Sequence, residues 1–204
     1  MAGAALALYG VWFALAFGLR TLIQVRRSGD SGWRGGSFGG RPGSAEWWAG
    51  VLFAVAIAVG VAAPVAGLLG LDPLVELGDV GQAVAVGVAA AGIALTLLAQ
   101  MAMGDSWRIG VDAGERTDLV TRGPFGLVRN PIFSAMLVTA VGLTAMVPNV
   151  IAAVGLAALV AALELQVRGC EEPYLLASHG HAYADYAGRV GRFVPAVGRL
   201  SPRR

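Results

Sequence analysis

The fold class follows from the hydrophobic stretch at residues 47–71, WWAGVLFAVAIAVGVAAPVAGLLGL, which contains no charged side chain. Similar runs occupy residues 4–25, with Arg20 near the end, and residues 80–103. A helix rises about 1.5 Å per residue, so about 20 apolar residues cross the hydrocarbon core of a bilayer. Each of the three runs exceeds that length and predicts a transmembrane helix.

Two shorter hydrophobic runs follow at residues 132–147 and 150–163. Pro148 and Asn149 separate them and are typical of a turn, so the pair predicts a tight helical hairpin. We therefore expect an all-α integral membrane bundle of about five transmembrane helices, followed by a cytoplasmic helical segment. The chain divides into an N-terminal part, residues 1–103, with three helices and an Arg-rich loop, and a C-terminal core, residues 104–204.

Composition supports a membrane protein. Of the 204 residues, 56% are hydrophobic and only 14% are charged, against a usual charged share of about 25% in soluble domains. Such a composition excludes a disordered chain. The formal net charge of +2 is too small to indicate a nucleic-acid partner. Arginine supplies all the basic residues, and Ala, Gly and Val are abundant, which suggests a GC-rich bacterial genome and hence the bacterial plasma membrane.

The arginines also predict the orientation. They gather in the loop after the first run, in the loop after the third run and in the C-terminal tail, whereas the link at residues 72–79 carries only acidic charges. Because cytoplasmic loops are enriched in Lys and Arg, the three Arg-rich segments should be cytoplasmic and the N-terminus outside. Small residues such as Gly87 and Gly92 allow close helix packing and would permit a homodimer.

Two polar segments, residues 103–133 and 167–195, lie on the predicted cytoplasmic side and carry the candidate chemistry. Asn130 is a favourable N-cap and Pro131 suits the first helical position, so a helix should start at Pro131. Its unpaired backbone N–H groups, beside Arg129, would suit a carboxylate or a phosphate. The alternative is an ordinary capped helix start next to an interfacial arginine.

Adjacent carboxylates, Glu171 and Glu172, follow the last hydrophobic run, where charge is costly. On a helix they point about 100° apart, so one can face a ligand while the other pairs with Arg168 or Arg129. The alternative is the solvated start of a cytoplasmic helix.

The residues that follow fit no metal site. His179, His181 and the single Cys170 match no standard zinc spacing, so we expect no metal. Tyr183 and Tyr186 share one face of a short amphipathic helix, and we expect them to pack at the membrane interface.

Together the two polar segments resemble the isoprenylcysteine carboxyl methyltransferase family, which are integral membrane enzymes that use S-adenosylmethionine. The resemblance covers about residues 100–195. The residues that carry it are Leu119-Val120-Thr121-Arg122-Gly123-Pro124-Phe125, Arg129-Asn130-Pro131-Ile132-Phe133, Glu171-Glu172, Leu175, His179-Gly180, Tyr183, Tyr186 and Pro195.

The resemblance implies a methyltransferase that moves a methyl group from S-adenosylmethionine to a lipophilic or small acceptor, with a carboxylate favoured. It implies a cytoplasmic cofactor pocket lined by Thr117, Asp118, Leu119, Val120, Phe125, Asn130, Pro131, Ile132 and Phe133, with Glu171 holding the cofactor. Arg129, Arg168 and Glu172 are the candidate catalytic residues, with the arginines orienting an acceptor carboxylate by a bidentate contact.

Two alternatives stay open. Asn130 stands where the family has His, and Phe125 and Phe133 stand where it has Tyr, which favours a non-catalytic membrane protein on the same scaffold. Related membrane reductases share part of the C-terminal layout, so an NADPH-dependent reductase is the second alternative.

Overall fold

A computed structural model describes residues 1–31, 41–104 and 118–200, and these residues form a helical bundle with one isolated β-bridge between Val128 and Gly191. The apolar helices of the bundle are a continuous rod of α1 (Ala2–Phe13), the π-helical turn η1 (Ala14–Leu19) and α2 (Arg20–Ser28), then α3 (Ala45–Leu68), α4 (Asp79–Ala102), α5 (Pro131–Met146) and α6 (Val150–Gln166). The C-terminal elements are the π-helical turn η5 (Val167–Glu171), α7 (Glu172–His179) and α8 (His181–Arg189), and a short 3-10 turn, η4 (Gly123–Gly126), precedes α5.

The predicted all-α membrane bundle is confirmed. Four helical rods in the described part of the chain, Ala2–Ser28, Ala45–Leu68, Asp79–Ala102 and Val150–His179, are long and apolar enough to cross a membrane. The remaining predicted span, α5, is apolar but has only 16 residues, fewer than the roughly 20 that cross a bilayer. The last rod is longer than the hydrophobic run that predicted it, because the helix continues past Leu163 through η5, which contains Gly169, into α7, where Pro173 stands in the first turn.

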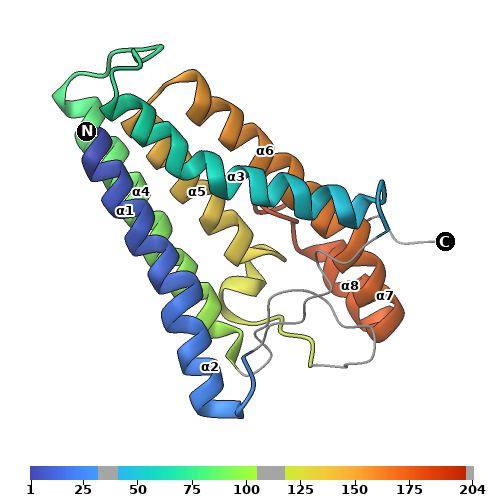
Figure 1. Cartoon of the computed structure of the whole chain (residues 1–204). Helices are drawn as coiled ribbons and strands as arrows, with labels where there is room; N and C mark the ends of the chain where they lie inside the picture. Colours follow the sequence, from blue (N-terminus) through green and yellow to red (C-terminus); the bar gives the residue numbers. More distant parts are fainter. Residues whose placement is uncertain (32–40, 105–117, 201–204) are drawn as a thin grey trace.

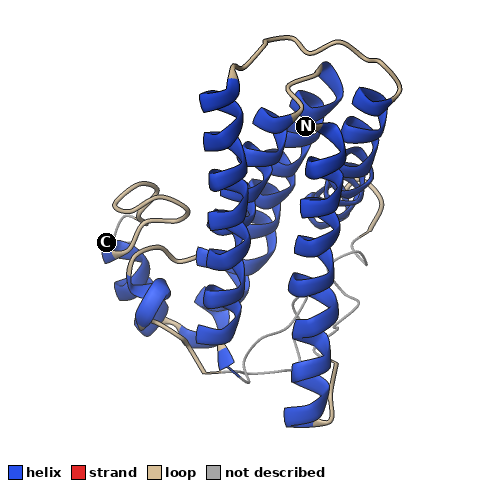
Figure 2. Ribbon diagram, turned by 90° about the vertical axis from the view of Figure 1, so that its left-hand side faces the viewer, coloured by secondary structure: helices blue, strands red, loops and turns tan. Residues whose placement is uncertain are grey.

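The helices pack as two close pairs, α4 against α5 and α3 against α6, with α1 beside α3 and α5 (Figures 1 and 2). Glycine allows the first pair to approach closely. A Cβ on Gly92 would overlap the backbone nitrogen of Thr139, and one on Gly142 would overlap the backbone of Ala89. Close contact through small residues is how membrane helices gain packing energy, so Gly92 serves the fold of a single chain.

Side chains from distant segments fix both ends of the bundle. Asn149 caps α6 by accepting from the Ala152 N–H at 2.9 Å, and its Nδ2 donates to the Ala63 carbonyl of α3 at 2.9 Å. At the opposite end Arg20, which is 1% exposed, donates to the Gly104 carbonyl at 2.7 Å. That end also carries α2, the start of α5, α7 and α8 (Figure 1), so the described parts of the Arg-rich segments lie together, as the arginine distribution predicted.

Candidate functional site

A cavity of about 250 Å³ lies at the end of the bundle that carries α7 and α8. Its apolar walls come mainly from Phe17, Phe53, Phe133, Met136 and Leu163. Its polar lining residues are Gln100, Asp118, Arg129, Asn130, Gln166, Glu171, Tyr174, Tyr183 and Tyr186. A mixed lining of this kind, mostly apolar with a few convergent polar groups, is typical of a ligand site.

The structure brings the predicted cofactor-binding residues together around this cavity. The residues among them that line it are Asp118, Leu119, Val120, Phe125, Asn130, Pro131, Ile132, Phe133 and Glu171. Thr117 lies outside the described residues. The two polar segments of the chain therefore converge on one cavity, while the roles of the individual residues stay predictions.

The helix start at Pro131 is as predicted, but Asn130 does not cap it through its side chain. The Asn130 Nδ2 donates instead to the Arg192 carbonyl at 3.2 Å, and the Asn130 backbone N–H donates to the same carbonyl at 3.1 Å. The first turn of α5 consequently receives no side-chain cap from Asn130, and its residues Pro131, Ile132 and Phe133 line the cavity.

A buried ion cluster holds the C-terminal segment, residues 190–200, against the start of α5. Glu172 accepts from Arg129 at 2.5 Å and from both Nε and NH2 of Arg192, at 2.8 and 3.0 Å. The side chains of Arg129, Glu172 and Arg192 are only 1%, 9% and 10% exposed. Two guanidinium groups share one carboxylate, so the cluster carries a net positive charge beside the cavity.

Arg129 also donates to three backbone carbonyls, those of Ala187 at 3.0 Å, Val190 at 2.6 Å and Gly198 at 3.1 Å. Its NH1 and NH2 donors are therefore committed within the protein, and Nε is buried without a partner in the described part of the chain. A guanidinium has five N–H donors, so Arg129 retains one for a ligand. The structure thus contradicts the bidentate contact expected of Arg129 and leaves a single hydrogen bond.

The other two candidate catalytic residues do not reach the cavity. Arg168 is 62% exposed in its side chain and pairs with Glu164, one turn earlier on the same helix. Glu172 is directed into the ion cluster. The adjacent carboxylates point in different directions, as predicted for neighbouring residues on a helix. Glu171 lines the cavity, and Glu172 pairs with Arg129.

The expectation that Tyr183 and Tyr186 pack at the membrane interface is wrong. Both are buried, at 2% and 5% exposure, and both line the cavity. The Tyr186 hydroxyl donates to the Phe125 carbonyl at 2.6 Å, which fixes the loop before α5. Burial raises the pKa of each phenol to about 12. The i, i+3 spacing showed that the rings share a face, but an amphipathic face can turn inward as well as toward lipid.

Sequence reasoning missed several residues of the site. Arg192 had no local signal, because its partner Glu172 lies 20 positions away. Gln100 and Phe53 come from α4 and α3, outside the two polar segments. Only Gln100, a buried amide inside a hydrophobic run, offered a signal, since polar groups within membrane helices are rare and functional.

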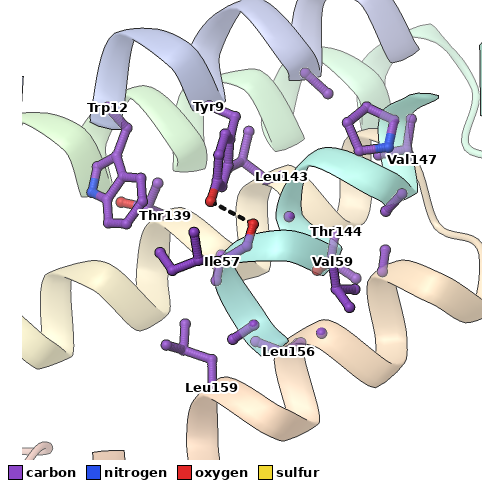
Figure 3. Close-up of a pocket in the computed structure, with 18 of the residues that line it drawn as sticks. Tyr9, Trp12, Ile57, Val59, Thr139, Leu143, Thr144, Val147, Leu156 and Leu159 are labelled. Atoms are coloured by element: carbon purple, nitrogen blue, oxygen red, sulfur yellow. Dashed lines mark hydrogen bonds between the residues drawn. The ribbon is translucent and has the colours of Figure 1, made fainter. Parts of the chain in front are cut away.

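A second, smaller cavity of about 70 Å³ lies deeper in the bundle between α1, α3, α5 and α6 (Figure 3). Apolar side chains such as Ile57, Leu143 and Leu156 line it, and Met136 lines both cavities. The Tyr9 hydroxyl on its wall is paired with the Ile57 carbonyl at 2.9 Å, whereas the Nε1 of Trp12, which also lines it, is buried without a partner in the described part of the chain. This cavity suits an apolar occupant.

Fold and site together define a helical membrane protein with a mostly apolar cavity, carrying a few polar groups, at one end of its bundle. The chain belongs to the phospholipid methyltransferase family, whose family model matches residues 80–182. It is also similar to protein-S-isoprenylcysteine O-methyltransferase B of Arabidopsis thaliana, with 36% identity over 83 residues, which is 41% of this chain and 42% of that protein. The match thus spans less than half of the relative, and it confirms the resemblance inferred from the two polar segments.

Proposed function

We propose that the protein transfers a methyl group from S-adenosylmethionine to a lipophilic acceptor at the 250 Å³ cavity. The observation that carries the proposal is the convergence of the predicted cofactor-binding residues on one cavity in a chain of the phospholipid methyltransferase family. The family match and the apolar helices show a membrane protein of a methyltransferase family, and the proposal adds the donor and the acceptor.

The residues present fit this cofactor. The single unpaired Nε–H of Arg129 and the first N–H groups of α5 suit its carboxylate. Glu171 suits its ammonium group or its ribose hydroxyls, and the rings of Phe125, Phe133 and Tyr183 supply apolar surface for the adenine.

The cofactor would supply a methyl group on a positively charged sulfur. The nucleophilic atom of a bound acceptor would bond to that carbon as the carbon–sulfur bond broke, and the electron pair of that bond would stay on sulfur. A carboxylate acceptor loses no proton, so no general base is required. The protein must instead hold the two groups in line and exclude water, which the buried faces of Tyr183 and Tyr186 favour.

The acceptor is expected to combine a reactive head group with an apolar chain. The smaller cavity lies within the membrane-spanning segments and shares Met136 with the larger one, so we place the apolar chain there. With the cavity end in the cytoplasm, as the arginines indicate, soluble cofactor enters from the cytoplasm and the acceptor enters from the bilayer of a bacterial plasma membrane.

The first test is calorimetric binding of S-adenosylhomocysteine to the purified protein in detergent, with NADPH as a comparison ligand. We expect micromolar binding of S-adenosylhomocysteine and none of NADPH. Binding of NADPH alone would assign a reductase, and binding of neither ligand to folded protein would assign a non-catalytic role.

The acceptor chain is tested with a matched pair of substitutions on α5. Ala140 lines the smaller cavity, whereas its neighbour Val141 is 48% exposed on the outside of the bundle. Ala140→Phe should reduce methylation of long-chain acceptors more than of short-chain acceptors, while Val141→Phe should leave both unchanged. Equal effects on both chain lengths would remove the acceptor chain from the smaller cavity.

A further inference from the structure

Gln100 is a buried polar residue that the family resemblance leaves without a role. It lies on α4, is 4% exposed and lines the larger cavity. Its Nε2 donates to the Ala16 carbonyl of η1 at 2.9 Å. Its Oε1 is buried and has no hydrogen-bond partner in the described part of the chain.

The contact with Ala16 fixes which end of the amide is unpaired. A backbone carbonyl only accepts hydrogen bonds, so the amide nitrogen must face Ala16 and the oxygen must be the open end. The alternative amide orientation would place two acceptors against each other. The open group is therefore an acceptor, and it calls for an N–H or O–H donor.

The surroundings of Gln100 also point to a ligand. Ala16 and Phe17 belong to η1 and line the same cavity, and Glu171 at the end of η5 lines it as well. Both π-helical turns in the described residues therefore border one cavity, and such turns occur frequently at functional sites. A buried acceptor without a partner destabilises a protein, so its presence in a ligand cavity needs an explanation.

We propose that Gln100 Oε1 accepts a hydrogen bond from an N–H or O–H group of the bound cofactor, which makes α1 and α4 part of the cofactor site. This inference rests on the proposed function. S-adenosylmethionine offers donors of three kinds, the adenine amino group, the ribose hydroxyls and the ammonium group. The family model matches the chain from residue 80 onward. Ala16, whose carbonyl holds the Gln100 amide, therefore lies in a part of the chain that the family model does not match.

The test compares Gln100→Leu with Gln82→Leu. Gln82 lies on the same helix and also has a buried Oε1 without a partner, but it lines neither cavity. By calorimetry in detergent, Gln100→Leu should bind S-adenosylhomocysteine about 3- to 10-fold more weakly than the unmodified protein, as expected for loss of one neutral hydrogen bond. Gln82→Leu should bind it with unchanged affinity.

A set of ligand analogues separates a direct contact from a structural effect. Each analogue lacks one kind of donor: the deaminated analogue of S-adenosylhomocysteine lacks the ammonium group, S-inosylhomocysteine lacks the adenine amino group, and deoxyribose analogues lack one hydroxyl. If Gln100 binds the ligand directly, the analogue without the relevant donor should bind the Gln100→Leu variant and the unmodified protein equally. An equal loss for all ligands would show a structural role and overturn the proposal.

Two further outcomes keep the proposals apart. Unchanged S-adenosylhomocysteine affinity in Gln100→Leu would overturn this inference and leave the proposed function standing, whereas no binding to the unmodified protein would overturn the proposed function itself. If Gln100→Leu does not fold, Gln100→Met replaces it, because methionine keeps the length and unbranched shape of the side chain without the amide.

Discussion

Replacing Glu172 by Gln should destabilise the protein strongly, because it removes the carboxylate shared by two buried guanidinium groups. The substitution keeps the shape of the side chain but leaves Arg129 and Arg192 facing each other without an anion. Three charge-assisted hydrogen bonds, at 2.5, 2.8 and 3.0 Å, are lost or weakened. Removing one partner of a buried ion pair costs about 3–5 kcal/mol.

This loss corresponds to about 6–20 °C in apparent Tm, since 1 kcal/mol shifts Tm by about 2–4 °C in a chain of this size. The measurement is thermal unfolding in detergent, read by circular dichroism and compared at one scan rate. Hydrogen exchange should also show that residues 190–200 lose protection first, because Arg129 and Arg192 attach that segment to the start of α5.

Glu171→Gln is the matched control, one residue away with the same chemical change. Glu171 lines the cavity and is not one of the three residues of the buried cluster, so its substitution should lower the apparent Tm less than Glu172→Gln does and should weaken S-adenosylhomocysteine binding. If both variants unfold at the same temperature as the unmodified protein, the cluster does not hold the C-terminal segment and the argument is refuted.

Three further predictions follow from contacts in the bundle and around the cavity. Gly92→Ala should lower the stability by about 1–3 kcal/mol because the added methyl group overpacks against Thr139. Gly87→Ala is the control and should not destabilise the protein, since a Cβ at Gly87 meets nothing within 4 Å. Equal Tm values for the two variants would show that α4 and α5 are not in close contact. Tyr186→Phe should cost about 1–3 kcal/mol, because the buried Phe125 carbonyl loses its donor, and thermal unfolding would show no change if the phenol is unbonded. The phenols of Tyr183 and Tyr186 should have a pKa of about 12 rather than the usual value of about 10. The stability that their burial contributes is therefore complete below pH about 10 and is lost as the pH rises through 12. The pKa of each phenol is measured by ultraviolet titration of the matching Tyr→Phe variants, and a value near 10 would contradict burial.

The sequence predicted the parts of the molecule that depend on local pattern. Hydrophobic run length predicted the membrane helices, and the Asn130-Pro131 pair predicted the start of α5, because both signals act within a few residues. The end of α6 was predicted too early in the chain. The hydrophobic run ends at Leu163, but the helix continues beyond it.

Pairings between distant residues were not predictable from local pattern. The Asn130 amide bonds to the Arg192 carbonyl, 62 positions later, instead of capping its own helix. Arg192 looked like any other arginine of a basic tail, and the inward direction of Tyr183 depends on α8 folding back over the loop. The candidate cofactor-binding residues could be predicted because the family resemblance indicates which distant residues share one site. Composition and periodicity lack this information.

The shared carboxylate has a consequence for how the protein is made. Arg192 follows every hydrophobic helix, so all of them leave the ribosome before the second guanidinium reaches Glu172. During synthesis the bundle can enter the bilayer while the ion cluster beside the cavity still lacks Arg192. Membrane insertion can therefore come before the cluster is complete, and in a nascent chain that stops short of Arg192 the Glu172 carboxylate has Arg129 but not Arg192 as a partner.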